Sequence, residues 1–253
     1  MDQDQYERDG YVHVSQMFTE NEVQLLGEIS RRDQEIEAGA TARSDAQGGK
    51  TVLAVRDSLG DDIYSAIVRC QRVAGTMTTL MGEEIYHYHH KLMLKEPRVG
   101  GAWEWHQDYG YWYNYGCLWP RMASCYIAID RANRDNGCLQ VIPGSHHLGR
   151  LEHGKVGGQT GCDPDRIDRI LEHLPLVHVE MEPGDALAFD GMTVHSAMGN
   201  RTTTRRRRGY AIRFAVDGAV YDPRDEVTEW LHDPLLEKGA AFRVGRFPLI
   251  YGT

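Results

Sequence analysis

The stretch Trp105-His106-Gln107-Asp108 is the most informative part of this sequence, because it places an imidazole and a carboxylate two residues apart. On a β-strand, residues i and i+2 project from the same face. A strand over residues 103–108 would therefore point His106 and Asp108 to one side and Gln107 to the other. Two such side chains provide adjacent corners of a site for a divalent metal ion.

A third ligand is expected from a strand that is distant in the sequence. His195 follows the apolar run Ala186–Phe189 and is the best candidate. Two histidines and one carboxylate form the facial triad of non-haem Fe(II) oxygenases, which leaves three coordination positions open. The alternative for the motif by itself is a structural histidine and an aspartate that hydrogen-bonds to nearby backbone.

Short strand-like runs lie on both sides of this motif, and dipeptides that favour turns separate them, such as Asn136-Gly137 and Pro183-Gly184. Helical patterns come earlier in the chain, so the order of elements predicts a mainly β protein with flanking helices, a barrel or jelly roll. The predicted strands are Lys91–Leu94, Trp103–Asp108, Ser124–Ile129, Cys138–Ile142, Leu176–Met181, Ala186–Phe189 and Gly209–Ala215.

Two helices are predicted before the strands and one between them. Thr19 and Glu22 have the spacing of a capping box and open the first helix, and residues 61–81 form the second. Residues 37–50 are rich in Gly, Ala and polar residues and predict a loop, and residues 163–174 predict a helical insertion. With no repeat or linker, residues 1–253 are expected to form one domain, helical over about 1–85 and a β core over about 86–217.

Composition narrows the class of protein. The 253 residues contain 28 Lys and Arg against 37 Asp and Glu, a net charge of −9, which disfavours a nucleic-acid partner. No apolar run approaches the roughly 20 residues that span a bilayer, and the first residues do not have the pattern of a signal peptide. Five cysteines without CxxC spacing favour free thiols. We expect a cytoplasmic protein with no membrane partner.

An arginine run, Arg205–Arg208, follows His195 by about a dozen residues and leads into the last predicted strand. A guanidinium group at that distance can reach into a barrel and bind a carboxylate with two parallel hydrogen bonds. A solvated basic loop is the preferred interpretation for any two of these four arginines.

Several collinear segments extend the pattern over most of the chain. The chain resembles the phytanoyl-CoA dioxygenase-like family of Fe(II)/2-oxoglutarate oxygenases, up to about residue 217. The resemblance implies a double-stranded β-helix that holds Fe(II) through His106, Asp108 and His195, with 2-oxoglutarate and O₂ as co-substrates. The matching segments are Tyr6–Val12 (YERDGYV), Lys91–Pro97 (KLMLKEP), Trp105–Tyr109 (WHQDY), Ile127–Asp130 (IAID), Asn136–His146 (NGCLQVIPGSH), Glu182–Phe189 (EPGDALAF), His195 and Arg207–Phe214.

The resemblance also implies residues that contact 2-oxoglutarate. Counting back from the last strand assigns Arg207 to its distal carboxylate, whereas counting forward from His195 favours Arg206. Loops absorb insertions more readily than strands, so Arg207 is preferred. Tyr126 matches an aromatic residue beside the co-substrate, and Lys91 points to the cofactor or the substrate. The chain departs from many members in having Ala197, not serine, two positions after the second histidine.

An aromatic stretch directly follows the metal motif, and Trp112 and Tyr113 are its candidates for contact with substrate. The alternative is structural packing at the mouth of the barrel. A second group, His87, His89 and His90, has no well-spaced carboxylate and is expected to be solvent-facing or to line the pocket.

These features together predict an Fe(II)- and 2-oxoglutarate-dependent dioxygenase that hydroxylates a small organic molecule and releases succinate and CO₂. Retention of Asp108 favours hydroxylation over halogenation, and desaturation, epimerisation and cyclisation stay open. One alternative is a cupin-type metal enzyme that does not use 2-oxoglutarate. Another is a non-catalytic barrel that binds a metal or a ligand. The sequence does not specify the substrate or the oligomeric state.

Overall fold

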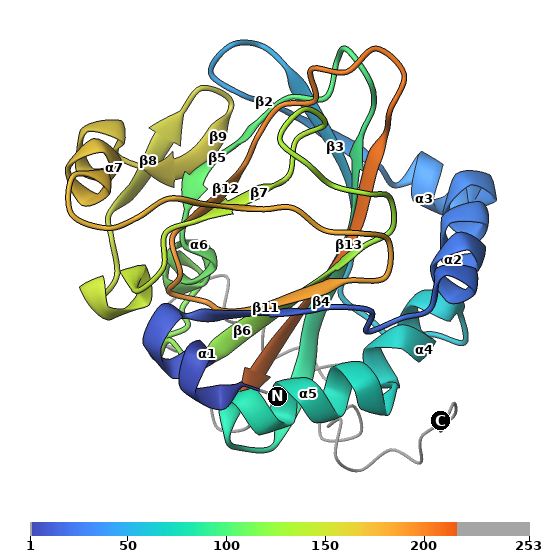
Figure 1. Cartoon of the computed structure of the whole chain (residues 1–253), viewed down its shortest axis with the longest axis horizontal. Helices are drawn as coiled ribbons and strands as arrows, with labels where there is room; N and C mark the ends of the chain where they lie inside the picture. Colours follow the sequence, from blue (N-terminus) through green and yellow to red (C-terminus); the bar gives the residue numbers. More distant parts are fainter. Residues whose placement is uncertain (1, 217–253) are drawn as a thin grey trace.

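Two antiparallel β-sheets face each other and enclose the interior of the molecule (Figure 1). The computed structural model describes residues 2–216, and the end of the expected domain, residues 217–253, lies outside the described residues. The arrangement is a double-stranded β-helix, which confirms the predicted jelly roll. The larger sheet has the strand order β1 (Tyr11–Val14), β11 (Ala186–Asp190), β6 (Met122–Ala128), β13 (Arg207–Val216), β4 (Ile85–Lys95), β3 (Lys50–Arg56), β2 (Thr41–Ser44). The smaller has the order β10 (Val177–Val179), β7 (Leu139–Val141), β12 (His195–Ala197), β5 (Trp103–His106).

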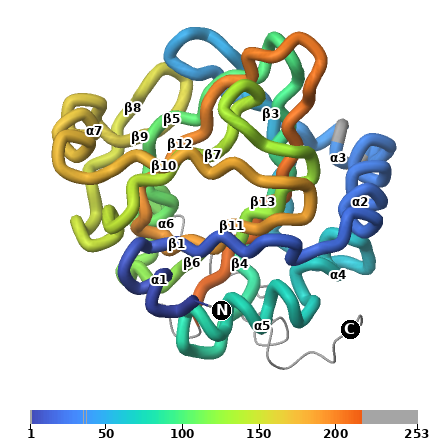
Figure 2. Tube along the Cα trace, in the orientation of Figure 1, coloured from blue at the N-terminus to red at the C-terminus, as the bar shows by residue number. Residues whose placement is uncertain are grey.

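Helices surround the two sheets, and a separate two-stranded hairpin lies beside the smaller one (Figures 1 and 2). Helices α2, α4 and α5 pack against the outer face of the larger sheet. The hairpin consists of β8 (His153–Val156) and β9 (Gln159–Cys162). The helices are α1 (Gln3–Asp9), α2 (Glu20–Arg32), α3 (Gln34–Ala38), α4 (Ile63–Arg69), α5 (Gln71–Met81), α6 (Asp108–Asn114), the 3₁₀ turn η1 (Ser145–Leu148) and α7 (Pro164–Leu171).

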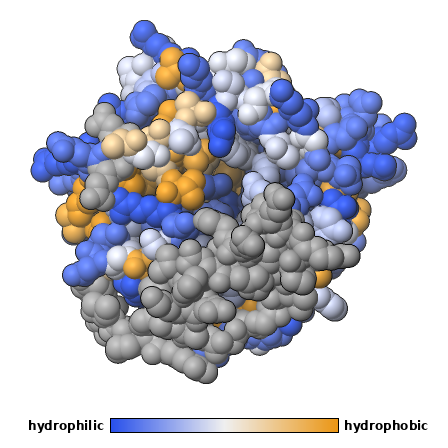
Figure 3. All heavy atoms as spheres, turned by 180° about the vertical axis from the view of Figure 1, so that it is seen from behind, coloured by the Kyte–Doolittle hydropathy of each residue, from blue (hydrophilic) through white to orange (hydrophobic). Residues whose placement is uncertain are grey.

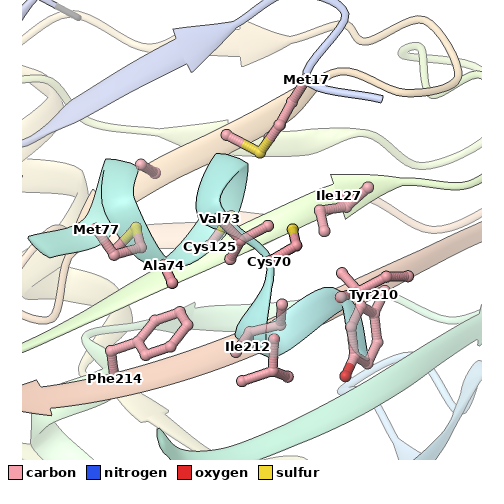
Figure 4. Packing of buried hydrophobic residues seen from close by; sticks show 14 of the residues in the cluster. Met17, Cys70, Val73, Ala74, Met77, Cys125, Ile127, Tyr210, Ile212 and Phe214 are labelled. Carbon is pink, nitrogen blue, oxygen red and sulfur yellow. The ribbon is translucent and has the colours of Figure 1, made fainter. Parts of the chain in front are cut away.

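The two-residue period of the central strands divides their side chains between two environments. On β13, Ile212 and Phe214 point outward and pack beneath α5 against Met77, as Figure 4 shows. Ala211, the residue before Ile212, points to the interior, where it packs with Tyr126 of β6. Alternate residues of the same strands therefore build the hydrophobic core and line the space between the sheets.

The capping box is present as predicted: the Thr19 side chain accepts from the backbone N–H of Glu22, and the Glu22 carboxylate accepts from that of Thr19. Helix α7 confirms the predicted insertion, with Asp163 as its N-cap. The predicted second helix is instead two helices, α4 and α5, because Cys70 is extended (φ −68°, ψ 148°) and serves as the cap between them.

Strands within the first 85 residues were not predicted. The prediction of a loop over residues 37–50 is wrong at its centre and its end, where Thr41–Ser44 forms β2 and Lys50 begins β3. Three of the four β2 residues are exposed on this sheet edge, so the strand has no alternation of apolar and polar residues. The amino-terminal part is consequently a mixture of helices and strands, and its strands extend the larger sheet at both edges.

The surface behind the view of Figure 1 is mostly polar over its described part, and its largest group of apolar atoms lies left of the centre in Figure 3. Within residues 2–216, none of the helices combines the length and the apolar character needed to cross a bilayer. All five cysteines are buried free thiols.

Phe214→Ala should lower the free energy of unfolding by about 3–5 kcal/mol, because a fully buried ring beneath α5 would leave a cavity. Leu25→Ala is the control, since Leu25 is 52% exposed and should change stability by less than about 0.5 kcal/mol. Urea denaturation followed by circular dichroism measures both. Similar losses in the two variants would contradict the assigned core.

Candidate active site

Three potential metal ligands meet between the two sheets. Single ligand atoms of His106, Asp108 and His195 all lie within 4.8 Å of one another, and the three side chains are buried. His106 lies on β5 and pairs directly with His195 on the neighbouring strand β12, so the ladder itself sets the two imidazoles side by side. Their ring centroids are 4.1 Å apart. The sequence therefore predicted correctly that these three residues come together.

The route by which Asp108 reaches the site differs from the prediction. The strand ends at His106, Gln107 is the N-cap, and Asp108 is the first residue of helix α6. Asp108 Oδ1 nevertheless lies 3.6 Å from His106 Nε2. Gln107 does point away from the metal ligands. Its side-chain amide donates to the carbonyl groups of Gly149 and Met192, and its oxygen accepts from the backbone N–H of Leu151.

Both histidines are oriented as metal ligands by their own backbone neighbourhood. Nδ1 of His106 lies 2.7 Å from the carbonyl oxygen of Glu104, and Nδ1 of His195 lies 3.0 Å from that of Thr193. A hydrogen bond donated from Nδ1 leaves the lone pair on Nε2, which faces the site. Burial, reinforced by His106, lowers the pKa of His195 to about 3. The imidazole is therefore neutral and able to ligate across the physiological pH range.

Asp108 is held by two further residues that the sequence reasoning did not identify. Arg213 on β13 forms an ion pair with its carboxylate, with Nε 2.8 Å from Oδ2, and donates from Nη2 to Oδ1 at 3.2 Å. Ser124 on β6 donates from Oγ to Oδ2 at 2.7 Å. Burial by itself raises the pKa of Asp108, but Arg213, His106, His195 and Lys91 together outweigh it, and the pKa lies well below its usual value. Asp108 is thus ionised, as a metal ligand must be.

A small inner chamber lies beside the triad and contains most of the residues predicted to bind 2-oxoglutarate. His106, His195, Lys91, Tyr126 and Arg207 line it, together with Phe189 and Arg213. Arg207 is 1% exposed; its Nε donates to the carbonyl of Gly137 at 2.9 Å, and its Nη1 donates to the Tyr126 hydroxyl at 2.6 Å. Arg207 Nη2 is buried without a hydrogen-bond partner among the described residues. A carboxylate oxygen would satisfy it.

Gly209 makes the hydrogen bond between Arg207 and Tyr126 possible. A Cβ atom there would collide with the hydroxyl of Tyr126, because the ring crosses the backbone of β13 at this residue.

Lys95 is another residue that the sequence reasoning missed. It is fully buried on β4 and donates to the carbonyls of Ala197 and Met198, which fixes β12 just after His195. Burial and the nearby Arg207 hold the pKa of Lys95 well below its usual value.

The remaining candidates occupy different places. Arg206 points outward and pairs with Glu96 at 2.9 Å, so Arg207, not Arg206, enters the chamber. Trp112 is buried and lines a second, outer chamber, with its ring at an edge-on angle to Tyr88. Tyr113 is among neither set of lining residues, and its ring instead lies under the guanidinium of Arg150, with 4.1 Å between ring centroid and Cζ.

The outer chamber has a volume of about 590 Å³ and reaches Asp108, one of the three candidate metal ligands. Lys91 and Trp103 line both chambers, and the Lys91 ammonium lies 5.4 Å from the centre of the Trp103 ring. Burial, reinforced by Arg213 and opposed by Asp108, lowers the pKa of Lys91 to about 7. Of the histidine group, His89 lines the outer chamber, whereas His87 and His90 hydrogen-bond to each other at 3.0 Å.

Comparison with protein families agrees with this geometry. The sequence profile of phytanoyl-CoA dioxygenase (PhyH) matches residues 6–209, which is most of the chain. The chain belongs to the phytanoyl-CoA dioxygenase family. The predicted resemblance is confirmed, and with it the prediction of a 2-oxoglutarate-dependent non-haem iron dioxygenase as the class of enzyme.

Curated relatives of this phytanoyl-CoA dioxygenase family member include several small-molecule oxygenases. L-proline trans-4-hydroxylase of Streptomyces griseoviridis is 27% identical over 224 residues, 79% of this chain and 81% of its own. Ectoine dioxygenase of Stutzerimonas stutzeri is 25% identical over 238 residues, 87% of this chain and 78% of its own. Methylphosphonate hydroxylase of Gimesia maris is 36% identical over a shorter match of 151 residues, 58% of this chain and 51% of its own.

Solved structures share the fold. The crystal structure of EctD from S. alaskensis with 2-oxoglutarate and 5-hydroxyectoine has a TM-score of 0.72 at 21% identity and covers 87% of this chain and 77% of its own. The epimerase SnoN in complex with Fe³⁺, α-ketoglutarate and nogalamycin RO has a TM-score of 0.71 at 23% identity and covers 87% and 84%. At these identities the likeness establishes the double-stranded β-helix.

Ser124→Ala should weaken Fe(II) binding about 10- to 100-fold, because the loss of a hydrogen bond to a ligating carboxylate disturbs its orientation. Anaerobic titration with Fe(II) measures the affinity. Ser30→Ala is a matched control, since Ser30 is also buried and hydrogen-bonded, to the carbonyl of Gly27, but lies on α2. Equal Fe(II) affinity in the Ser124 and Ser30 variants would exclude a role for Ser124 in the metal site.

Proposed function

We propose that this chain hydroxylates a small organic molecule at an Fe(II) centre held by His106, Asp108 and His195, with release of succinate and CO₂. Fe(II) bound with 2-oxoglutarate and O₂ supplies an oxidant strong enough to attack an unactivated C–H bond. The observation that carries the proposal is the inner chamber, where the two histidines of a complete facial triad lie in the same wall as Arg207, whose guanidinium has an unsatisfied nitrogen.

The residues present fit both groups. Two neutral imidazoles and an ionised carboxylate are the donor set that Fe(II) takes in this class, and their ligand atoms already converge. Arg207 would bind the distal carboxylate of 2-oxoglutarate, with Tyr126 fixing the guanidinium in place. Asp108 would remain a ligand, so the proposal is hydroxylation and not halogenation.

The outer chamber would receive the substrate. It adjoins the inner chamber through Lys91 and Trp103 and extends to Asp108, so a molecule lodged there would present a C–H bond to the metal side. Trp112 would form part of its wall. Small molecules are also the substrates named for relatives such as L-proline trans-4-hydroxylase and ectoine dioxygenase, which supports this size class. A cytoplasmic location remains a prediction, supported by the five free thiols.

The proposal is tested by anaerobic addition of Fe(II) and 2-oxoglutarate, followed by the weak metal-to-ligand absorption band of the chelate. Admission of O₂ should then give succinate in amounts that depend on 2-oxoglutarate. A folded protein that binds Fe(II) but shows neither the band nor succinate would instead support a cupin-like protein that does not use 2-oxoglutarate.

Arg207→Ala should weaken 2-oxoglutarate binding about 10- to 100-fold, because a charged hydrogen bond in a buried site contributes about 1.5–3 kcal/mol. Fe(II) affinity in the absence of 2-oxoglutarate should not change. The neighbouring Arg206→Ala is the matched control, since Arg206 is paired with Glu96 outside the chamber. Titration of the absorption band with 2-oxoglutarate distinguishes the two. A larger effect at Arg206 would reverse the assignment.

A further inference from the structure

We propose that the outer chamber selects small organic anions, and that Arg43, Lys91 and Lys155 hold the acid group of the substrate. The inference rests on the proposed function, because it takes the outer chamber as the place from which a substrate reaches the metal. It assigns the substrate a chemical class, an acid group joined to an apolar body, and assigns three residues to its recognition.

The first observation is the balance of charge on the chamber wall. Arg43, Lys91 and Lys155 line it, and the only carboxylate among the lining residues is Asp108. Asp108 is already paired with Arg213 and is a metal ligand in the proposed function. Within residues 2–216, none of the three cations forms an ion pair. Two exposed cations without an ion pair, Arg43 and Lys155, and the buried amine of Lys91 around one cavity are notable in a chain with a net charge of −9.

Close backbone contact brings two of these cations to one mouth. Arg43 lies on β2 and Lys155 on β8, strands of different sheets. The turn after β8 fits against the turn after β2 through two glycines: a Cβ atom at Gly157 would lie 2.7 Å from the backbone nitrogen of Ala46, and one at Gly158 would lie 2.9 Å from the carbonyl oxygen of Ser44. The two hairpins therefore meet at the chamber, and each contributes a basic side chain to its lining.

Two acidic groups at these turns are engaged by backbone N–H groups. Asp45 accepts from the backbone N–H groups of Gln47, Gly49 and Ala102. The Glu104 carboxylate accepts from the backbone N–H of Ala46 at 2.9 Å. Neither of them lines the chamber, so they fix the β2–β3 turn and do not neutralise the cations at the mouth.

The inner chamber has separate cations for the two carboxylates within it or beside it. Arg207 is available for the distal carboxylate of 2-oxoglutarate, and Arg213 balances Asp108. The co-substrate therefore does not need Arg43 or Lys155, which are exposed at the mouth. Lys91 lies at the boundary between the chambers, where it can contact an acid group that enters from outside.

The other residues that line the outer chamber indicate the chemical nature of the rest of the substrate. Trp103, Trp112, Tyr111 and Tyr115 line the same cavity as the cations. The volume of about 590 Å³ lies within the range of small-molecule sites. Flat aromatic side chains bind an apolar body, while the cations fix its acid group and so set which carbon faces the metal. Carboxylates and phosphonates share this chemistry.

The test uses the protein loaded anaerobically with Fe(II) and 2-oxoglutarate. The three probes share a benzyl group and differ in the polar group: phenylacetate, benzylphosphonate and the neutral phenylacetamide. Trp103 and Trp112 line the chamber, so quenching of tryptophan fluorescence reports binding without turnover. We expect both anions to bind at least tenfold more tightly than the amide, and the tighter of the two identifies the preferred acid group. We expect their affinity to fall with added salt.

Arg43→Gln and Lys155→Gln should each weaken anion binding several-fold and leave amide binding unchanged. Arg166→Gln on α7 removes the same charge from an exposed position that does not line the chamber, and should have no effect. Equal binding of amide and anions, no binding of either anion, or equal effects of all three variants would each overturn the proposal. The absorption band of the same preparation reports the 2-oxoglutarate chelate separately, so failure of the proposed function is seen independently.

Discussion

The buried charge of Asp108 is the constraint on which the rest of the site depends. Its side chain is almost inaccessible to water, and an isolated carboxylate there would cost far more than a small domain can sustain. Arg213 compensates it with an ion pair and Ser124 with a hydrogen bond, from two strands of the larger sheet. The site is therefore folded around an ionised acid before any metal binds, and one oxygen remains directed toward the histidines.

This compensation requires the larger sheet to send basic side chains inward from a strand whose other face is a hydrophobic core. Strand β13 meets both demands through its two-residue period, with Tyr210, Ile212 and Phe214 under the helices and Arg207 and Arg213 between the sheets. Arg213 also lies 5.8 Å from the centre of the Phe189 ring, which supports it from β11. Mutations in the core beneath α5 should consequently disturb both guanidinium groups through this strand.

The sequence was most informative where chemistry and periodicity coincide. The triad was predictable, because a histidine and a carboxylate two residues apart match adjacent metal ligands and the collinear family segments supported His195 as the third, and β13 was predictable as a strand-like run. Choosing Arg207 over Arg206 followed from counting back from the strand residues Tyr210 and Ile212, because loops absorb insertions more readily than strands. The structure bears out that choice of side chain, although its role in binding 2-oxoglutarate remains a proposal.

Other features could not be predicted because their signals are not local. Arg213 lies in an otherwise apolar strand, and its role follows only from its contact with Asp108, which lies 105 positions away in the sequence. The edge strand β2 is polar and exposed, so it lacks the apolar alternation that marks a strand, and its pairing with β3 gives it order. Tyr113 belongs to an aromatic run whose members turn to different sides of a short helix, and sequence alone does not show which of them reaches the chamber.

The two chambers divide the work of recognition between different parts of the fold. The inner chamber is lined by strands of both sheets, among them β4, β6, β12 and β13, whose ladders hold Arg207, Tyr126 and His195 in fixed register. The outer chamber is completed by the β2 and β8–β9 segments, which lie at the margins of the sheets. Within residues 2–216, β2 and β8 share no sheet with β5 and β12, the strands of the two histidines, so the exposed side chains of Arg43 and Lys155 can change without disturbing the ladder that sets those histidines. Selectivity for a substrate can therefore be set at the mouth, while the strands preserve the chemistry of the centre.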